Sequence, residues 1–212
     1  MKKILFILLL VVIFNCIQYD IFGMQEKVNE TVYIEFFSTI NTESINKLII
    51  EIEEKISKGK DKFFIIIESS GGSTSEGFRI FNYLEGIDAE IITYNIGSVS
   101  SMAFIMFCAG DKRYCSLYSR FTYHKTGYNL SDFRLDLGNI DVYYQQLEIE
   151  KKYIVDILFS IIGKKRAKEI IEKDYLNHTT YTSEQALEYN LVHEIKEKVI
   201  PRDAEIIRII LE

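Results

Sequence analysis

From residue 31 onward the sequence alternates between strand-like and helix-like hydrophobic patterns, and this alternation constrains the fold more than any other feature. Residues 32–37 and 89–94 have strand-like compositions, and residues 63–67 read FFIII without interruption. Such an unbroken apolar run is typical of a strand buried on both faces of a parallel sheet. Residues 42–57 instead repeat apolar side chains at spacings of three and four, which predicts an amphipathic helix. Strands that alternate with helices predict a layered α/β domain with parallel strands.

The same alternation continues along the chain. A buried helix is expected at residues 101–109, because this stretch is apolar on every side and stops at Gly110. Glycine-bearing turns at residues 69–72 and 95–98 follow buried strands and precede helices. The other expected elements are a helix at residues 74–84, short strands near 113–116 and 121–124, helices at 165–174 and 183–190, and a strand at 191–195.

A longer periodic segment lies between residues 137 and 161. Positions spaced alternately by three and four residues are apolar or aromatic there, apart from Lys151. The spacing predicts a long amphipathic helix whose apolar stripe needs a partner surface, either within the domain or on another copy.

The composition fits one globular domain without a metal or nucleic-acid site. The chain has 212 residues, of which 48% are apolar, enough for a single core. The net charge is −6, and the sequence has no basic cluster of the kind that nucleic acids require. Three cysteines are too few for a disulfide framework, and no Cys/His spacing resembles a zinc site. We therefore expect no metal and no cofactor, and we expect Cys108 and Cys115 to be buried structural thiols.

The N-terminus carries the pattern of a targeting segment. Lys2 and Lys3 precede an apolar run over residues 4–17 that is broken only by Asn15. A positive segment followed by an apolar one of this length is the signal-peptide pattern, whereas a membrane span needs about 20 apolar residues. We expect a signal peptide or N-terminal membrane anchor at residues 1–23, rather than a first core strand or helix. The two lysines then favour export of the rest of the chain, to the periplasm, the cell exterior or an outward-facing anchored position.

The second glycine-bearing turn leads into the run GSVSSM at residues 97–102. Ser101 is expected at the amino end of the buried helix, where free amides and the positive end of the helix dipole stabilise a developing oxyanion. A serine hydroxyl needs a neighbouring base, and His124 at the end of a short strand is the candidate. From the pattern alone, an ordinary helix cap and a solvated or hydrogen-bonded strand-end histidine are the simpler interpretations.

Several short motifs occur in a defined order along the chain. They are ESSGG at residues 68–72, GSVSSM at 97–102, AG at 109–110, KRYC at 112–115, SRFTYH at 119–124 and EQALEYNLV at 184–192. In the same order, these runs resemble the Asn-Ser-Pro-Gly-Gly turn, the Gly-x-Ala-Ala-Ser-Met nucleophile motif and the later signatures of the Clp protease proteolytic subunit (ClpP) family. We place the ClpP-like protease domain at residues 30–198 and a C-terminal tail without assigned function at residues 199–212.

The resemblance implies a fold and a chemistry. The fold would be the ClpP/crotonase-like layered α/β fold of βα repeats with a long projecting helix. Ser101 would attack the scissile carbonyl and His124 would accept and return the proton, while the amides of Gly72 and Met102 would bind the oxyanion. The resemblance also implies peptide or unfolded-protein substrates and a homo-oligomeric ring in which the long helix joins subunits. Export separates the chain from cytoplasmic ATP, so no ATPase partner is expected, and a retained leader would act as a membrane tether.

The third catalytic position departs from the family pattern. Where the family has Asp, an ungapped alignment places His178, with Asn177 beside it and Asp174 one helical turn earlier. A neutral His178 would orient the catalytic histidine without supplying charge, and Asn177 or Asp174 are the alternatives. Ser70 replaces the turn proline, and Asn190 replaces a glycine, which asparagine tolerates because it also adopts left-handed conformations.

Two other functions remain open. Without the Asp, the chain would fit a catalytically weakened family member that acts as a scaffold or binding subunit. The other alternative is a signal-peptide-peptidase-like protease with a Ser–Lys dyad, because Lys125 stands next to His124.

Overall fold

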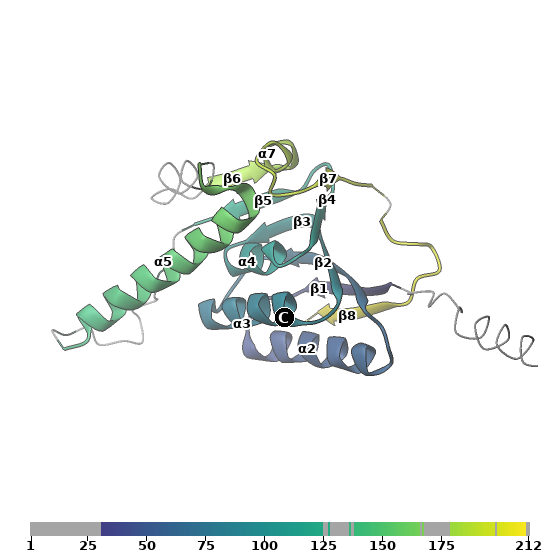
Figure 1. The fold of residues 1–212 in the computed structure, drawn as a ribbon, viewed down its shortest axis with the longest axis horizontal. Helices are drawn as coiled ribbons and strands as arrows, with labels where there is room; N and C mark the ends of the chain where they lie inside the picture. The colour runs from purple at the N-terminus through teal and green to yellow at the C-terminus, as the bar shows by residue number, and fades with distance from the viewer. Residues whose placement is uncertain are drawn as a thin grey trace, which may run out of the picture. The chain divides into compact units, whose positions relative to one another are not determined.

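A sheet of mostly parallel strands forms the centre of the computed structural model (Figure 1), which describes residues 31–124, 127, 136, 138–165, 167, 179–197 and 199–210. Its strands are, in chain order, β1 (Val32–Phe37), β2 (Lys62–Ser69), β3 (Glu90–Ser100), β4 (Lys112–Cys115), β5 (Arg120–Tyr123), β6 (Thr179–Thr182), β7 (Glu194–Ile195) and β8 (Ile206–Ile210). The main path runs β6-β5-β3-β2-β1-β8, and β4 pairs with β3 and β7 beside it. Every pair is parallel except β5 with β6, which confirms the predicted α/β class.

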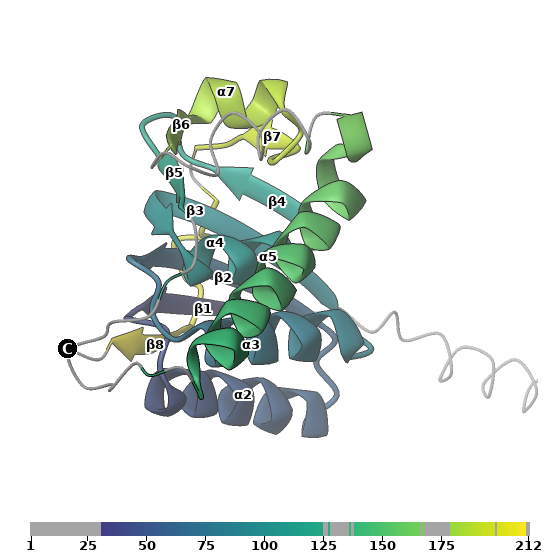
Figure 2. The same ribbon diagram turned by 90° about the vertical axis from the view of Figure 1, so that its left-hand side faces the viewer.

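Helices cover one face of this sheet, and one of them projects from the rest. The described helices are α2 (Thr42–Ser57), α3 (Thr74–Gly86), α4 (Met102–Cys108), α5 (Ile140–Ile162) and α7 (Ser183–Glu188). Figures 1 and 2 show α2, α3 and α4 on the same side of the sheet, with α5 crossing α3 and α4 and extending beyond them. Tyr153 of α5 packs edge-on against Phe78 of α3, with ring centroids 5.7 Å apart. The predicted long helix is therefore confirmed, and Ile154 and Leu158 of its apolar stripe are buried within the domain.

α2 begins at a well-formed cap. The Asn41 side chain accepts a hydrogen bond from Ser44 N at 2.9 Å, and the Ser44 hydroxyl accepts one from Asn41 N at 3.2 Å. Such a reciprocal pair satisfies two backbone amides at the start of a helix and fixes the direction in which the chain enters it. The cap therefore also fixes the residue before it, Ile40, which is buried.

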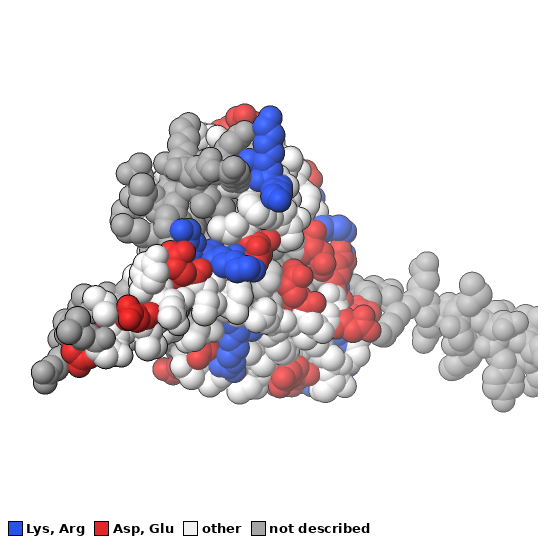
Figure 3. Space-filling view, turned by 60° about the vertical axis from the view of Figure 1, so that its left-hand side comes forward, with Lys and Arg blue, Asp and Glu red and all other residues white. Residues whose placement is uncertain are grey.

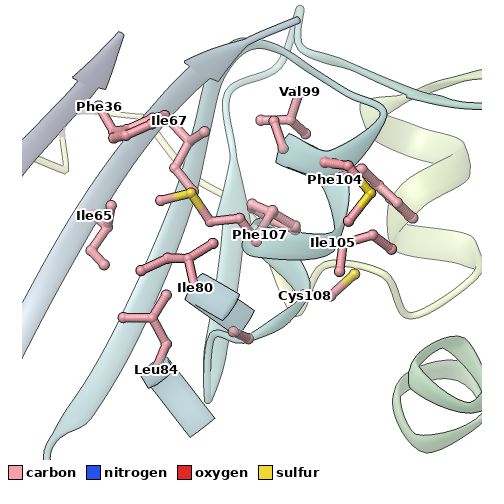
Figure 4. Packing of buried hydrophobic residues seen from close by; sticks show 14 of the residues in the cluster. Phe36, Ile65, Ile67, Ile80, Leu84, Val99, Phe104, Ile105, Phe107 and Cys108 are labelled. Carbon is pink, nitrogen blue, oxygen red and sulfur yellow. The ribbon is translucent and has the colours of Figure 1, made fainter. Parts of the chain in front are cut away.

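The core has two layers because both faces of the sheet are covered. Along β2, Ile65 and Ile67 face the helices together with Phe107 of α4 (Figure 4). Phe64 and Ile66 belong to a second apolar cluster, separate from the first. Because neighbouring side chains of a strand point to opposite faces, β2 is buried on both, as its unbroken apolar run predicted.

β3 is longer than the sequence predicted. The turn expected at residues 95–98 is instead an internal part of this strand. The middle of β3 pairs with β4 and its end pairs with β5, so one strand serves two neighbours in succession. Asn95 supports this change, because its side-chain amide donates to Arg120 O at 2.9 Å and accepts from Gly97 N at 3.1 Å. Gly97 favours a turn locally, but pairing with the neighbouring strands keeps this segment extended.

Within residues 199–212, predicted as a C-terminal tail, residues 206–210 form a strand of the sheet. β8 lies parallel to β1, and its residue Ile209 is fully buried. Arg208 also donates to Glu35 of β1 at 2.8 Å. The alternation of charged and apolar residues in this segment therefore reflects an edge strand with one face on the core.

Two expected segments lie outside the described residues. They are the leader at residues 1–23 and most of the helix expected at residues 165–174. In the part of the chain that the structure describes, no helix combines the length and hydrophobicity that crossing a bilayer requires.

Several charged side chains on the surface have neighbours of opposite sign. On the face shown in Figure 3, Lys and Arg side chains lie in separate groups beside Asp and Glu side chains. Glu90 contacts Lys112 at 2.6 Å and Lys62 at 3.0 Å, and hydrogen bonds from these two ammonium groups lower the pKa of Glu90. These contacts join the beginnings of β2, β3 and β4 on the surface, where such pairs stabilise by about 0–1 kcal/mol each.

Candidate active site

Ser101 and the turn that follows β2 meet at the carboxyl end of the sheet. A methyl group built on Gly71 would lie 2.6 Å from Ser101 Cβ, 2.7 Å from Ser100 O and 3.0 Å from Met102 N. The α-carbon of Gly71 therefore lies directly against the start of α4, and any larger residue would collide with it. Ligand sites in α/β folds gather at this end of the strands. The structure thus brings the Gly71–Gly72 turn, Ser101 and Met102 together.

Ser101 stands at the joint between β3 and α4 in an unusual backbone conformation. Its φ is 55° and its ψ is −127°, a combination that residues other than glycine rarely adopt. Its side chain makes no capping hydrogen bond to the described helix α4, so the ordinary helix-cap interpretation does not hold. In α/β-hydrolases, a strained strand-to-helix turn of this kind presents the nucleophilic serine. Hydrophobic periodicity says nothing about the backbone angles of a single residue, so this conformation could not be predicted from the sequence.

His124 follows β5, the strand that lies beside the end of β3. The Ser101 amide donates to Thr122 O at 2.9 Å, two residues before His124. Because β3 and β5 are parallel, the chain carries Ser101 and His124 out of the sheet at the same end. Both residues are half-buried. A half-buried serine and histidine at one end of adjacent strands are the elements from which a nucleophile and its base are built.

The backbone around Gly72 is held from one side, and the Gly72 amide faces the other. Ile40 N donates to Gly71 O at 2.8 Å, and Ser73 N donates to Ile40 O at 2.8 Å, forming an isolated parallel bridge between Ile40 and Gly72. In such a bridge the amide and carbonyl of the paired residue itself point away from the partner. The Gly72 amide is therefore directed away from Ile40, and a carbonyl oxygen is the kind of group it would bind. The role of Ile40 depends on a contact with a residue far along the chain, so no sequence pattern indicated it.

The residues proposed for the third catalytic position are not placed. His178, Asn177 and Asp174 lie outside the described residues, as does Lys125. Their contribution to the site therefore stays a prediction.

Arg113 of the KRYC motif is buried and supports the fold around the site. Its guanidinium donates to Gly110 O at 2.8 Å and to Leu191 O at 2.9 Å, and burial lowers its pKa. Arg113 therefore ties the end of α4 to the segment after α7. Cys108 and Cys115 are buried thiols, as predicted. Burial raises the pKa of both, that of Cys108 to about 12, so neither supplies a thiolate nucleophile at neutral pH.

Known proteins resemble this chain in sequence and in structure. The ATP-dependent Clp protease proteolytic subunit 2 of Borreliella burgdorferi is 31% identical over 140 residues, which cover 65% of this chain and 68% of that protein. The subunit of the same name from Thermobifida fusca is 26% identical over 159 residues, covering 74% and 76%. A solved mutant of ClpP1 from Listeria monocytogenes superimposes with a TM-score of 0.67 at 20% identity, covering 81% of this chain and 93% of that one. The structural match confirms the predicted ClpP/crotonase-like fold.

The family model described as Clp protease matches residues 18–199, which is most of the chain. This match extends across the glycine turn, the Ser101 joint, the strand that leads to His124 and α7, so it includes the whole of the site described above. The sequence motifs, the fold and these relatives agree, and the chain belongs to the Clp protease family.

Proposed function

We propose that this protein is a ClpP-like serine endopeptidase in which Ser101 is the nucleophile and His124 the general base. The main observation behind this proposal is the strained backbone at Ser101, between β3 and α4, which packs directly against Gly71. Backbone strain of about 1–3 kcal/mol persists where the surrounding structure holds it, and it concentrates at functional sites. Membership in the Clp protease family supports the same assignment.

The chemistry follows the general course of serine hydrolases. The Ser101 hydroxyl oxygen attacks the carbonyl carbon of the scissile peptide bond while His124 takes its proton. The carbonyl oxygen becomes negative and is stabilised by the amides of Gly72 and Met102. The C–N bond then breaks, and His124 gives the proton to the leaving amine. Water attacks the acyl-enzyme by the same route, which releases the acid and restores the serine.

We assign the third catalytic position to His178, with Asn177 or Asp174 as alternatives. A neutral histidine orients the ring of His124 by accepting its hydrogen bond, but it does not stabilise the imidazolium with a negative charge. In a well-studied triad, loss of that charge lowers kcat by about 10⁴. We therefore propose a slow enzyme, and His178 is the reason for its low turnover.

The proposal includes a cellular setting. The leader at residues 1–23 supports export, and an exported enzyme acts without a cytoplasmic ATPase on short peptides or unfolded segments. A homo-oligomeric ring is supported by α5, on which Val142, Tyr144 and Ile149 are at least half exposed although they are apolar or aromatic. Contact with a second subunit would remove these side chains from water.

Covalent labelling with a fluorophosphonate probe tests the nucleophile. The full chain should be labelled, Ser101→Ala should not, and Ser100→Ala should be labelled like the wild type. Ser100 is a matched control because it is the adjacent serine and the family motif has alanine at that place. Equal labelling of Ser101→Ala and the wild type would remove Ser101 from the mechanism.

Two further variants separate the remaining functions. If His178→Asp raises the rate of peptide cleavage strongly, the enzyme has an attenuated triad, whereas no activity in either form supports a scaffold or binding subunit. If Lys125→Ala abolishes cleavage while His124→Ala is tolerated, the enzyme uses a Ser–Lys dyad instead.

A further inference from the structure

Ser69, the last residue of β2, makes a buried hydrogen bond to the turn that follows it. Its hydroxyl accepts a hydrogen bond from Gly71 N at 3.1 Å, and its side chain is buried, with 6% of its surface exposed. A serine hydroxyl that accepts from the amide two residues on is a turn-stabilising contact. Burial removes competing water, so this contact holds the peptide plane before Gly71 more firmly than an exposed one would.

The turn that Ser69 holds would otherwise have wide conformational freedom. Gly71 and Gly72 have φ values of 93° and 150°, both in the region that glycine enters readily. The chain has a single proline, Pro201, so no proline ring restrains this turn. On one side, Ile40 anchors the turn through Gly71 O and Ser73 N. The bond from Ser69 anchors the Gly71 amide, which the bridge to Ile40 does not use.

Ser69 also connects the turn to the strand that leads to Ser101. Its backbone is in register with Val99 of β3, two residues before Ser101, immediately after an irregularity in the β2–β3 pairing. Through its hydroxyl, the same residue holds Gly71, which packs against Ser101. Ser69 therefore links the strand that leads to Ser101 with the turn that packs against Ser101.

We propose that Ser69 is a positioning residue for the oxyanion-binding turn: it fixes Gly71 so that the Gly72 amide is aimed at the oxygen that becomes negative during attack by Ser101. This inference rests on the proposed serine-peptidase function. Removal of the hydroxyl should leave substrate binding largely unchanged and weaken stabilisation of the transition state. The effect should appear in kcat and in reactions that form an oxyanion, and not in KM.

The matched pair Ser69→Ala and Ser70→Ala tests this role. Ser70 lies in the same turn but is exposed, whereas Ser69 is buried. The readout is the bimolecular rate of fluorophosphonate labelling at Ser101, normalised to the folded fraction from circular dichroism. Ser69→Ala should be labelled about 10-fold more slowly than the wild type, which is less than the 10²–10³-fold loss typical of deleting an oxyanion donor outright. Ser70→Ala should keep the wild-type rate.

A third variant and a second measurement test whether a general loosening of the fold, and not the lost hydrogen bond, slows the labelling of Ser69→Ala. Ser69→Thr keeps the hydroxyl acceptor and should recover most of the labelling rate. Where a fluorogenic peptide is cleaved, Ser69→Ala should lower kcat with KM nearly unchanged. Labelling of Ser69→Ala at the wild-type rate overturns the inference, as does equal slowing of Ser70→Ala. If wild-type Ser101 is not labelled at all, the proposed function itself has failed, which is a distinct result.

Discussion

The α-carbon of Gly71 packs directly against Ser101, so closely that a methyl group on Gly71 would come within 2.6 Å of Ser101 Cβ. This contact joins two turns that are thirty residues apart in the sequence. It places the Gly71–Gly72 turn next to Ser101. The proposed chemistry needs that proximity, because an oxyanion hole works only when its donors lie within hydrogen-bond distance of the reacting carbonyl.

Gly71→Ala should therefore abolish labelling at Ser101 and destabilise the fold. The substitution adds a collision with Ser101 and Ser100 to a positive φ that costs about 1–2 kcal/mol in any L-residue. Gly59→Ala is the matched control, since Gly59 also has a positive φ, of 79°, but among the described residues only its own chain neighbours lie within 4 Å of the added methyl group. Both variants should lose stability in urea unfolding, and Gly71→Ala should lose more. Normal labelling of Gly71→Ala would contradict the packing described for this turn.

Ser101→Gly should stabilise the protein while it removes activity. The backbone angles at Ser101 suit glycine, so the substitution relieves strain of about 1–3 kcal/mol, reduced by the extra chain entropy that glycine loses on folding, about 0.5–1 kcal/mol. Ser101→Ala keeps the β-carbon and should keep the strain, so it should remove activity without raising the stability of the fold. The melting temperatures of the two inactive variants, measured by thermal unfolding, test this difference. A melting temperature for Ser101→Gly at or below that of Ser101→Ala would show that the joint is not strained.

Ile209→Ala should show that the C-terminal strand is part of the core. Ile209 is fully buried against the sheet, and truncation of a buried isoleucine costs about 2–5 kcal/mol in the free energy of unfolding. Ile210 in the same strand is 56% exposed, so Ile210→Ala should change stability by no more than about 0.5 kcal/mol. Chemical denaturation of the two variants measures the difference. Equal, small effects would mean that residues 206–210 do not pair with β1 in solution.

His193 should make the stability depend on pH. Partial burial, and then the charge of Arg113, lower the pKa of His193 below its ordinary value of about 6.5. The unfolded chain therefore takes up this proton at a higher pH than the folded one does. The contribution of neutral His193 to the free energy of unfolding is fully present above about pH 6.5. It is lost as the pH falls from that value through the lower pKa of the folded state.

The variant His193→Asn isolates this contribution to the pH dependence. The ring of His193 accepts a hydrogen bond from Arg113 N at 3.0 Å through Nδ1, which a protonated ring cannot do. The asparagine side-chain oxygen can accept that bond but does not titrate. Melting temperatures measured from pH 7.5 to 5.5 should fall less steeply in His193→Asn than in the wild type. Identical slopes would assign the pH dependence to other groups.

Much of the fold was predictable because it depends on local patterns. The bounds of β1 and α2 agree with the expected residues 32–37 and 42–57, and the unbroken apolar run of β2 correctly indicated burial on both faces. Asn190 has the left-handed φ, 59°, that its replacement of a family glycine suggested. In each case neighbouring residues carry the information, since side-chain periodicity and the preferences of single residues act over a few positions.

The amino-acid sequence was sufficient to predict the class of the fold and the family, and it predicted Ser101 and His124, the two residues on which the proposed chemistry depends. Three contacts became visible only in the tertiary structure. Gly71 packs against Ser101, Ile40 forms a bridge with Gly72, and β8 pairs with β1. These contacts join residues that are distant in the chain, as the Arg208–Glu35 pair is across 173 positions. Their partners are chosen by the packing of the whole sheet, so no local pattern encodes them.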